Sequence, residues 1–194
     1  MPGGPIRRRG RGTQEWWGMD LDSSNPGSWT PVSARRIGLV SDTHGDVLGT
    51  TRGLDLLIAE SVDLILHLGD LGSDAVVDRM AGLPVRLVLG NVDPPHLARY
   101  ATLIGLTVDH PAMRLQVGER RIFATHGHLD SEVRSGLSDR PDYVIHGHTH
   151  QARDERIDGI RFLNPGAVHR GSPPSVAILD PVDDDFTLRH VPEH

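Results

Sequence analysis

The clearest pattern in the chain is a series of short apolar runs, each followed by polar residues and glycine. Residues 36–41, 63–68 and 85–89 form such runs, and their continuous apolar character is typical of strands buried on both faces. The runs are too far apart for tight hairpins. Parallel neighbours need crossover connections of this length, so the three runs predict a parallel sheet.

The segments between these runs have helical spacing. After the first run, the large apolar residues fall on one side of a predicted helix, which we expect to be buried. These residues are Leu48, Leu54, Leu57 and Ile58. Residues 74–80 predict a second helix before the third run. The first half of the chain therefore alternates strand, helix, strand, helix, strand.

After residue 95 the apolar runs become shorter and the turns closer, which is typical of a largely antiparallel half. Strands are predicted at 106–109, 113–117, 120–125, 142–146, 152–157, 160–164, 175–180 and 186–191, with a short helix at 131–137. The pair Asp158-Gly159 is a strong hairpin turn. Two sheets packed face to face, with helices outside, would accommodate both halves.

The first 34 residues differ in texture from the rest. They lack sustained periodicity and are rich in glycine and proline, so we expect a disordered extension at 1–34 and one domain at 35–194. We expect the arginine-rich run at 7–11 to be a solvated tail rather than a nucleic-acid contact, because the chain has a net charge of -6.

The composition excludes all cysteine-based sites and argues against a membrane span or a secretory signal. Without cysteine, the chain cannot form disulfides, iron–sulfur clusters, thiolate zinc sites or cysteine nucleophiles. No apolar run approaches the ~20 residues of a membrane span, and the basic N-terminus lacks the apolar core of a secretory signal. We therefore expect a cytoplasmic protein without a membrane partner. The sequence leaves the oligomeric state open, a homo-oligomer included.

Polar residues of metal-binding type follow five of the predicted strands, at the point where each strand ends. They are Asp42, His44, Asp70, Asn91, His126, His148 and His150. Taken singly, Asp42 or Asp70 would more simply cap a helix or form a turn. Ligands of α/β sheets bind beyond the carboxyl ends of the strands, so the whole set should meet at one rim. Together these residues predict a metal site.

The number of these residues indicates two metal ions rather than one. Seven ligands are too many for one typical ion, whereas two ions could share the Asp70 carboxylate. Two divalent ions carry +4 and two carboxylates return −2, so a phosphate ester with a bridging hydroxide would balance the remaining charge. Paired ions also stabilise the attacking and leaving oxygens and generate a nucleophile from water. We expect Mn²⁺, with Fe, Ni or Zn as alternatives.

The ordered motifs resemble those of the calcineurin-like metallophosphoesterases. The match is closest to small prokaryotic phosphodiesterases, to which the metallophosphoesterase-like subunit of retromer is also similar. It rests on Asp42-x-His44, Gly69-Asp70, Gly90-Asn91-x-Asp93, Thr125-His126-Gly127-His128, Gly147-His148-Thr149-His150 and Asn164-Pro165-Gly166-Ala167. The resemblance covers residues 35–194. It implies an α/β fold, a four-layer α/β/β/α sandwich of two mixed sheets flanked by helices, with a di-metal centre at the sheet ends.

The resemblance also implies a role for each residue. One ion would be held by Asp42, His44, Asp70 and His150, and the other by Asp70, Asn91, His126 and His148. Asp70 and Asn91 would therefore be catalytic. His146 is expected to support a ligand from behind, and Asp93 to orient Asn91 or a neighbouring histidine.

One position departs from the pattern of many family members. They have a histidine between the Asn and the Asp of the third motif, where it can protonate the leaving group, and this chain has Val92. Small members commonly lack that histidine too. Because valine cannot donate a proton, we expect a preference for good leaving groups unless His128 or a metal-bound water substitutes.

These observations predict a metal-dependent phosphoesterase that acts on a small-molecule phosphate ester, most simply a phosphodiester. The alternatives are a phosphomonoesterase with the same centre and a non-catalytic scaffold. A scaffold would be expected to lose ligands, whereas every ligand position is filled. We expect specificity to lie in loops at 94–101 and 169–174, where His169 and Arg170 could face a phosphate.

Overall fold

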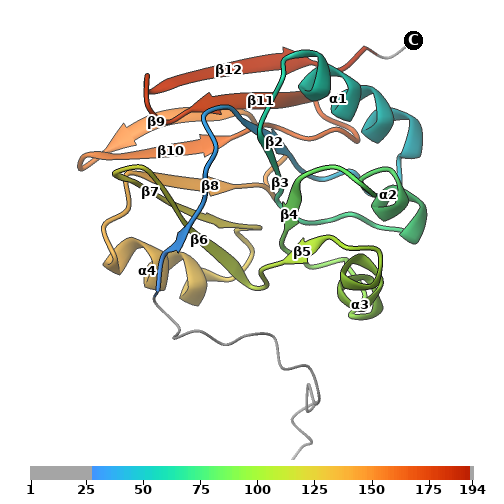
Figure 1. Ribbon diagram of the computed structural model, residues 1–194, viewed down its shortest axis with the longest axis horizontal. Coiled ribbons are helices and arrows are strands. Elements are labelled where there is room, and N and C mark those ends of the chain that lie inside the picture. Colours follow the sequence, from blue (N-terminus) through green and yellow to red (C-terminus); the bar gives the residue numbers. More distant parts are fainter. Residues whose placement is uncertain (1–27, 193–194) are drawn as a thin grey trace, which may run out of the picture.

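The structure is a computed structural model that describes residues 28–192, and it consists of two six-stranded sheets packed face to face (Figure 1). The first, called here the β2 sheet, has the order β12-β11-β2-β3-β4-β5. Its strands are β2 (Ile37–Val40), β3 (Leu64–His67), β4 (Val85–Leu87), β5 (Thr107–Val108), β11 (Ser175–Asp180) and β12 (Asp185–His190). The β8 sheet has the order β1-β6-β7-β8-β10-β9. Its strands are β1 (Thr30–Pro31), β6 (Ala112–Val117), β7 (Arg120–Thr125), β8 (Tyr143–His146), β9 (Arg153–Ile157) and β10 (Ile160–Asn164).

Both sheets are mixed, which confirms the predicted fold class. In the β2 sheet, β2, β3, β4 and β5 are parallel, while β11 runs antiparallel to β2 and β12 antiparallel to β11. In the β8 sheet, β7, β8 and β10 are parallel neighbours. The second half of the chain is thus less antiparallel than its short runs predicted, and its last hairpin returns to the first sheet.

Helices cover the outer faces of the two sheets, so the molecule has four layers (Figure 1). The helices are α1 (Val47–Ala59), α2 (Asp74–Asp78), α3 (His96–Leu103) and α4 (Asp130–Ser138). The core between the sheets contains Leu39, Leu66, Ile122 and Ile145, all fully buried or nearly so. Each such side chain stabilises the fold by roughly 1.5–3 kcal/mol relative to exposure.

Helix α1 buries a different face from the one its large residues predicted. Leu54 and Leu57 are buried as expected, but Leu48 is 68% exposed and Ile58 is 50% exposed. The helix instead lies close to β11 through small residues, and an added Cβ on Gly53 would lie 3.0 Å from Val176 Cγ1. The close approach of the α1 backbone to the sheet therefore determines which face of the helix is buried, and the size of its apolar side chains does not.

The segment 94–101, which we expected to be a loop, is mostly helical. Helix α3 begins at His96, directly after Pro95, a position that tolerates proline because the first N–H groups of a helix have no partner in it. Leu97 and Ala101 are buried on the same face, four residues apart. Their burial against the β2 sheet stabilises the helix despite its weak sequence signal.

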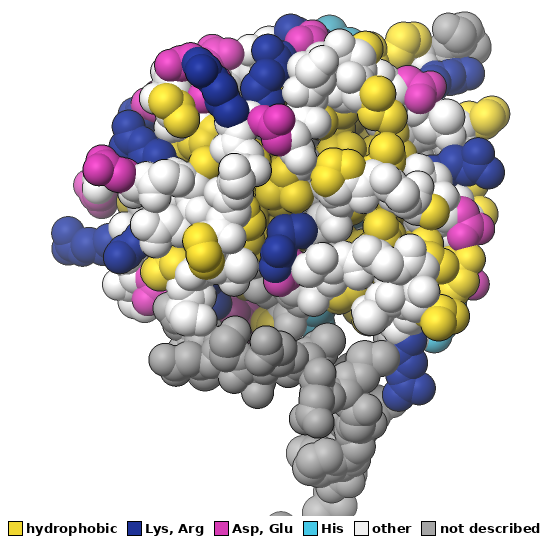
Figure 2. All heavy atoms as spheres, in the orientation of Figure 1, with side chains coloured by type: hydrophobic (Ala, Val, Ile, Leu, Met, Phe, Trp, Pro, Cys, Tyr) yellow, Lys and Arg dark blue, Asp and Glu magenta, His cyan; other side chains and the backbone are white. Residues whose placement is uncertain are grey.

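The described part of the chain begins within the predicted N-terminal extension. Thr30 and Pro31 form β1, which is parallel to β6, so this part of the predicted extension belongs to the β8 sheet. Residues 1–27, including the arginine run at 7–11, lie outside the described residues. On the face shown in Figure 2, arginine and acidic side chains are interspersed. None of the helices in residues 28–192 has the length and apolarity that a membrane crossing requires.

Candidate metal centre

The loops after β2 and β3 continue side by side beyond the ends of their strands. The N–H of Asp42 donates to Gly69 O (3.1 Å), and the N–H of His44 donates to Asp70 O (2.9 Å). Asp42, His44 and Asp70 all have positive φ angles, of 55°, 44° and 56°. Such angles cost side-chain-bearing residues roughly 1–2 kcal/mol each. The paired backbone therefore holds three predicted ligands in a strained but defined turn.

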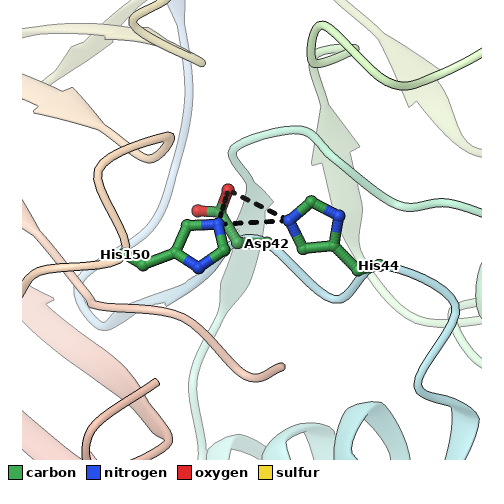
Figure 3. A group of neighbouring side chains, drawn as sticks. All are labelled: Asp42, His44 and His150. Carbon is green, nitrogen blue, oxygen red and sulfur yellow. Dashed lines mark hydrogen bonds and ion pairs between the residues drawn. The ribbon is translucent and has the colours of Figure 1, made fainter. Parts of the chain in front are cut away.

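The first group of predicted ligands combines Asp42 and His44 with His150, from the loop after β8 (Figure 3). Asp42 Oδ1 lies 3.2 Å from His150 Nε2 and 3.9 Å from His44 Nε2. The two Nε2 atoms are 3.1 Å apart. These three atoms face one common point, although His44 and His150 are separated by 106 residues in sequence.

The two oxygens of Asp42 differ in their surroundings. Oδ2 accepts hydrogen bonds from the Ser41 hydroxyl (2.6 Å) and from the N–H of His148 (3.1 Å). Oδ1 is buried and accepts no hydrogen bond from residues 28–192. A buried acceptor without a donor is costly, and a cation between Oδ1 and the imidazoles would satisfy it.

The second group of predicted ligands surrounds Asp70. Asp70 Oδ1 lies 3.4 Å from His126 Nε2, and His126 Nε2 lies 3.1 Å from Asn91 Oδ1. On the other side, Asp70 Oδ2 lies 3.6 Å from His44 Nε2. Asp70 therefore contacts histidines of both groups, and Asp42 also lies close to Asp70 and His126.

His126 is oriented by a backbone carbonyl. Its Nδ1 lies 2.7 Å from Leu68 O, which can only accept, so Nδ1 carries a proton and Nε2 faces Asp70 and Asn91. Metal-binding histidines commonly have this arrangement. The pKa of Asp70 shows how polar the site is: burial raises it, but the hydrogen bond and charge of His126, with the Val92 N–H, lower it to about 2.

His148 and His128 complete the second group. The ring of His148 lies 5.1 Å from that of His126, and the His128 ring lies 5.3 Å from His126 and 6.2 Å from His148. His128 Nδ1 is buried and has no hydrogen-bond partner among the described residues. Burial, followed by the charges of His126 and His148, lowers the pKa of His128.

The carboxylates of the site fit a cation. Within residues 28–192, the partners of Asp42 and Asp70 are a hydroxyl, backbone N–H groups and imidazoles rather than arginine. Two glycines bring the loops close enough: a Cβ on Gly90 would lie 2.0 Å from Asp70 Oδ1, and one on Gly147 would lie 2.9 Å from Asp42 Oδ2. The donor set of nitrogen and oxygen atoms suits a divalent transition ion.

Asp93 and His146 contact the backbone of the loops rather than a neighbouring ligand. Asp93 accepts hydrogen bonds from the N–H groups of Gly72 (2.9 Å) and Gly90 (2.8 Å). The bond from Gly90 holds the backbone directly before Asn91, and the orientation of Asn91 or a histidine by Asp93 stays a prediction. His146 Nδ1 lies 3.0 Å from Gly147 O, so it touches the loop that carries His148 and His150.

Sequence reasoning missed the role of Asn164. This buried side chain donates to Gly147 O (3.0 Å) and Thr149 Oγ1 (3.1 Å), and accepts from the N–H of Gly166 (2.8 Å). It thereby fixes the loop that carries His148 and His150. The Asn-Pro-Gly-Ala motif was the only sequence signal for these contacts, because the partners of Asn164 include backbone groups and lie up to 17 residues away.

The two predicted substrate residues lie on the His44 side. The N–H of His169 donates to Asp42 O (3.0 Å), and its ring lies 5.9 Å from the ring of His44. Its Nδ1 is 3.8 Å from Asp46 Oδ2. Arg170 is exposed and has a positive φ angle of 55°. His169 thus borders the first group of ligands.

Comparison with known proteins finds relatives that are named phosphodiesterases. The chain is 28% identical over 156 residues to the phosphodiesterase MJ0936 of Methanocaldococcus jannaschii, with 75% of this chain and 92% of that protein covered. A solved structure described as a novel archaeal phosphodiesterase superposes with a TM-score of 0.72 at 25% identity, covering 80% of this chain and 99% of the other. Vacuolar protein sorting 29 from Cryptosporidium parvum shares the fold, with a TM-score of 0.54 at 18% identity over 80% of this chain and 97% of the other.

A family model covers most of the described chain. Residues 36–184 match the calcineurin-like phosphoesterase superfamily domain. This range contains all seven residues that converge at the rim of the sandwich, and it confirms the resemblance drawn from the motifs. The chain therefore belongs to the calcineurin-like phosphoesterase superfamily and is a hydrolase of phosphoester bonds.

Proposed function

We propose that this chain hydrolyses phosphodiesters with two divalent metal ions held at the rim of the sandwich. The observation that carries the proposal is the convergence of metal-binding side chains from five strand ends on two carboxylates that face imidazoles. The similarity to relatives named phosphodiesterases supports the diester as the bond that is cleaved.

Each ion would have its own ligands, with Asp70 shared. One would be held by Asp42, His44, Asp70 and His150, and the other by Asp70, Asn91, His126 and His148. When bound, the two ions would supply Lewis-acid charge to the phosphate and a nucleophile from water near neutral pH. Mn²⁺ is the ion we expect, with Fe, Ni and Zn as alternatives.

We propose that His128 protonates the leaving group. Val92 is 50% exposed at the position between Asn91 and Asp93 and has no proton to give. His128 is the imidazole beside His126 and His148 whose Nδ1 has no partner within residues 28–192. Proton donation matters most when the leaving group is poor. His128→Gln should therefore lower kcat/KM more for phenyl esters than for p-nitrophenyl esters, and an equal loss on both would exclude this role.

The substrate would approach from the side of His169 and Arg170. His169 lies beside His44 and is fixed through its backbone to Asp42 O. Arg170 is exposed next to it and carries a charge that suits a phosphate oxygen. Loss of either side chain should raise KM for the diester more than it lowers kcat. A small-molecule substrate and a cytoplasmic location remain predictions from the sequence.

The test is hydrolysis of bis-p-nitrophenyl phosphate and p-nitrophenyl phosphate by metal-stripped protein, with Mn²⁺, Ni²⁺, Zn²⁺ or Mg²⁺ added back in turn. Asp70→Asn and His148→Ala serve as site variants. Replacing the shared carboxylate should reduce activity by at least about 100-fold, since even residues behind metal ligands typically contribute 10–100-fold.

The outcomes separate the alternatives. Metal-dependent cleavage of the diester, lost in both variants, supports the proposal. Faster cleavage of the monoester would replace it with a phosphomonoesterase. Two bound ions without hydrolysis of either ester would favour a non-catalytic scaffold. Absence of metal binding would overturn the proposed centre.

A further inference from the structure

His67 is a buried ionisable side chain to which the proposed chemistry gives no task. It is the last residue of β3 and its exposed fraction is 0%. It lies three residues before Asp70, and its ring is enclosed between the loops after β2 and β3. Burial lowers the pKa of His67 to about 4, so the ring is neutral at neutral pH.

The hydrogen bonds of His67 fix its tautomer. The N–H of Gly69 donates to His67 Nδ1 (3.2 Å), so Nδ1 has no proton and Nε2 carries it. Nε2 lies 3.2 Å from Thr43 Oγ1, which therefore accepts the bond. The Thr43 hydroxyl in turn donates to Leu71 O (3.2 Å). The hydrogen bonds therefore form a chain of donors and acceptors from Gly69 through His67 and Thr43 to Leu71, which links the β3 loop with the β2 loop.

The two loops that His67 joins carry ligands of both proposed ions. Thr43 lies between Asp42 and His44 in the sequence, and Gly69 directly precedes Asp70. The backbone of both loops is strained, with positive φ angles at Asp42, His44 and Asp70, which all carry side chains. Strained turns persist only where their surroundings hold them. The imidazole of His67 is a side-chain link that connects the two loops directly beneath the ligands.

We propose that His67 is a positioning residue that sets the spacing between the two metal ions by joining the Asp42–His44 loop to the Asp70 loop. The inference rests on the proposed two-metal function. It predicts that the Nε2–H···Thr43 bond is needed to hold the shared carboxylate in register with the ligands of the first ion. In this role His67 would contact neither the ions nor the substrate.

The experiment compares two variants that each keep one half of the imidazole. His67→Asn keeps an acceptor near the Nδ1 position but cannot reach Thr43, whereas His67→Gln places an amide N–H near the Nε2 position. The measurements are Mn²⁺ affinity by calorimetry and low-temperature electron paramagnetic resonance at two Mn²⁺ per chain. Coupling between the ions depends on their spacing, so the spectrum reports position independently of activity. Thermal unfolding of the metal-free variants controls for packing.

We expect wild type to bind two coupled ions. His67→Asn should bind the second ion about 10–100-fold more weakly, the range found for residues that orient metal ligands, and should show uncoupled Mn²⁺. His67→Gln should restore both properties. The same result from Thr43→Val, with rescue by Thr43→Ser, would support the link from its other end and covers the case in which His67→Asn fails to fold.

Three outcomes would overturn the inference. Wild-type affinity and coupling in His67→Asn and Thr43→Val would show that the link is not needed. Equal losses in His67→Asn and His67→Gln, with equal losses of melting temperature, would show that the ring only fills space. If wild type binds fewer than two ions, both this inference and the proposed function fail, whereas loss of the His67 effect alone leaves the function intact.

Discussion

The two ends of the sandwich treat charge in opposite ways. At the amino ends of the parallel strands, several carboxylates form ion pairs with arginine: Arg161 contacts Asp154 and Asp184, and Arg35 contacts Asp180 and Asp183. At the carboxyl ends, Asp42 and Asp70 meet imidazoles and backbone N–H groups instead. At the amino ends, these negative charges are neutralised by arginines of the same chain. At the carboxyl ends, carboxylate oxygens and imidazole nitrogens face one another without an arginine from the described part of the chain.

This difference indicates what each end is for. At the amino ends, the ion pairs neutralise the carboxylates without a bound ion or ligand. At the carboxyl ends, Asp42 Oδ1 is buried without a hydrogen bond from any described residue. Such an atom is costly unless something outside the chain satisfies it. The ion pairs therefore stabilise the amino ends. At the carboxyl ends, the unpaired buried oxygen destabilises the metal-free protein and is suited to binding a cation.

The largest expected effect on stability comes from metal loading. An ion at 100 times its Kd stabilises the folded state by about 2.7 kcal/mol per site, so two sites should raise the melting temperature by roughly 10 °C or more. Thermal unfolding with Mn²⁺ and with chelator measures this shift. Asp42→Asn should lose most of it, while Asp180→Asn, at the opposite end, should keep it. An equal response in both variants would contradict the comparison.

The next effect concerns alkaline pH at the amino ends. Burial raises the pKa of Tyr143 to about 12, and its hydrogen bond to Asp184 (2.9 Å) adds to the rise. A raised pKa contributes stability that is complete below pH 10 and is lost as the pH rises to 12. This loss should be about 2–3 kcal/mol. Urea unfolding at several pH values measures it.

The second tyrosine provides a matched control for this pH dependence. Tyr100 donates to Asp78 on the exterior of the molecule, so Tyr100→Phe should retain most of the alkaline loss. Tyr143→Phe should abolish it. The attribution to Tyr143 is wrong if both variants show the same pH dependence as wild type.

The smallest effect is expected from an ion-pair variant at the amino ends. The Arg161 side chain is 11% exposed, but its partners Asp154 and Asp184 are 42% and 35% exposed, so solvent screens the pairs. Arg161→Gln should lower the free energy of unfolding by about 1–2 kcal/mol, between surface and buried pairs. Denaturant unfolding should show a smaller loss in high salt. Metal-dependent hydrolysis should be unchanged. Its loss would show that the amino ends contribute to activity, which would contradict the separation of the two ends.

The sequence predicted the fold and the residues that converge, and it failed where close packing decided the result. Strands and ligand positions were visible because buried strands read as apolar runs with polar residues at their ends. Helix α3 was missed because its stability comes from burial of Leu97 and Ala101 rather than from helix propensity. The exposure of Leu48 followed from glycines that let α1 approach β11, which apolar size does not encode.

By itself, the sequence determined the order of most strands and helices, the residue types at the strand ends and the family. It could do so because these depend on local composition and spacing. Only the tertiary structure decided which residues meet: His150 joins Asp42 from a distant loop, and His67 and Asn164 hold loops through hydrogen bonds. Such contacts depend on sheet register and on left-handed backbone at Asp42, Asp70 and the histidines of the β8 loop, and the packing of the two sheets fixes both.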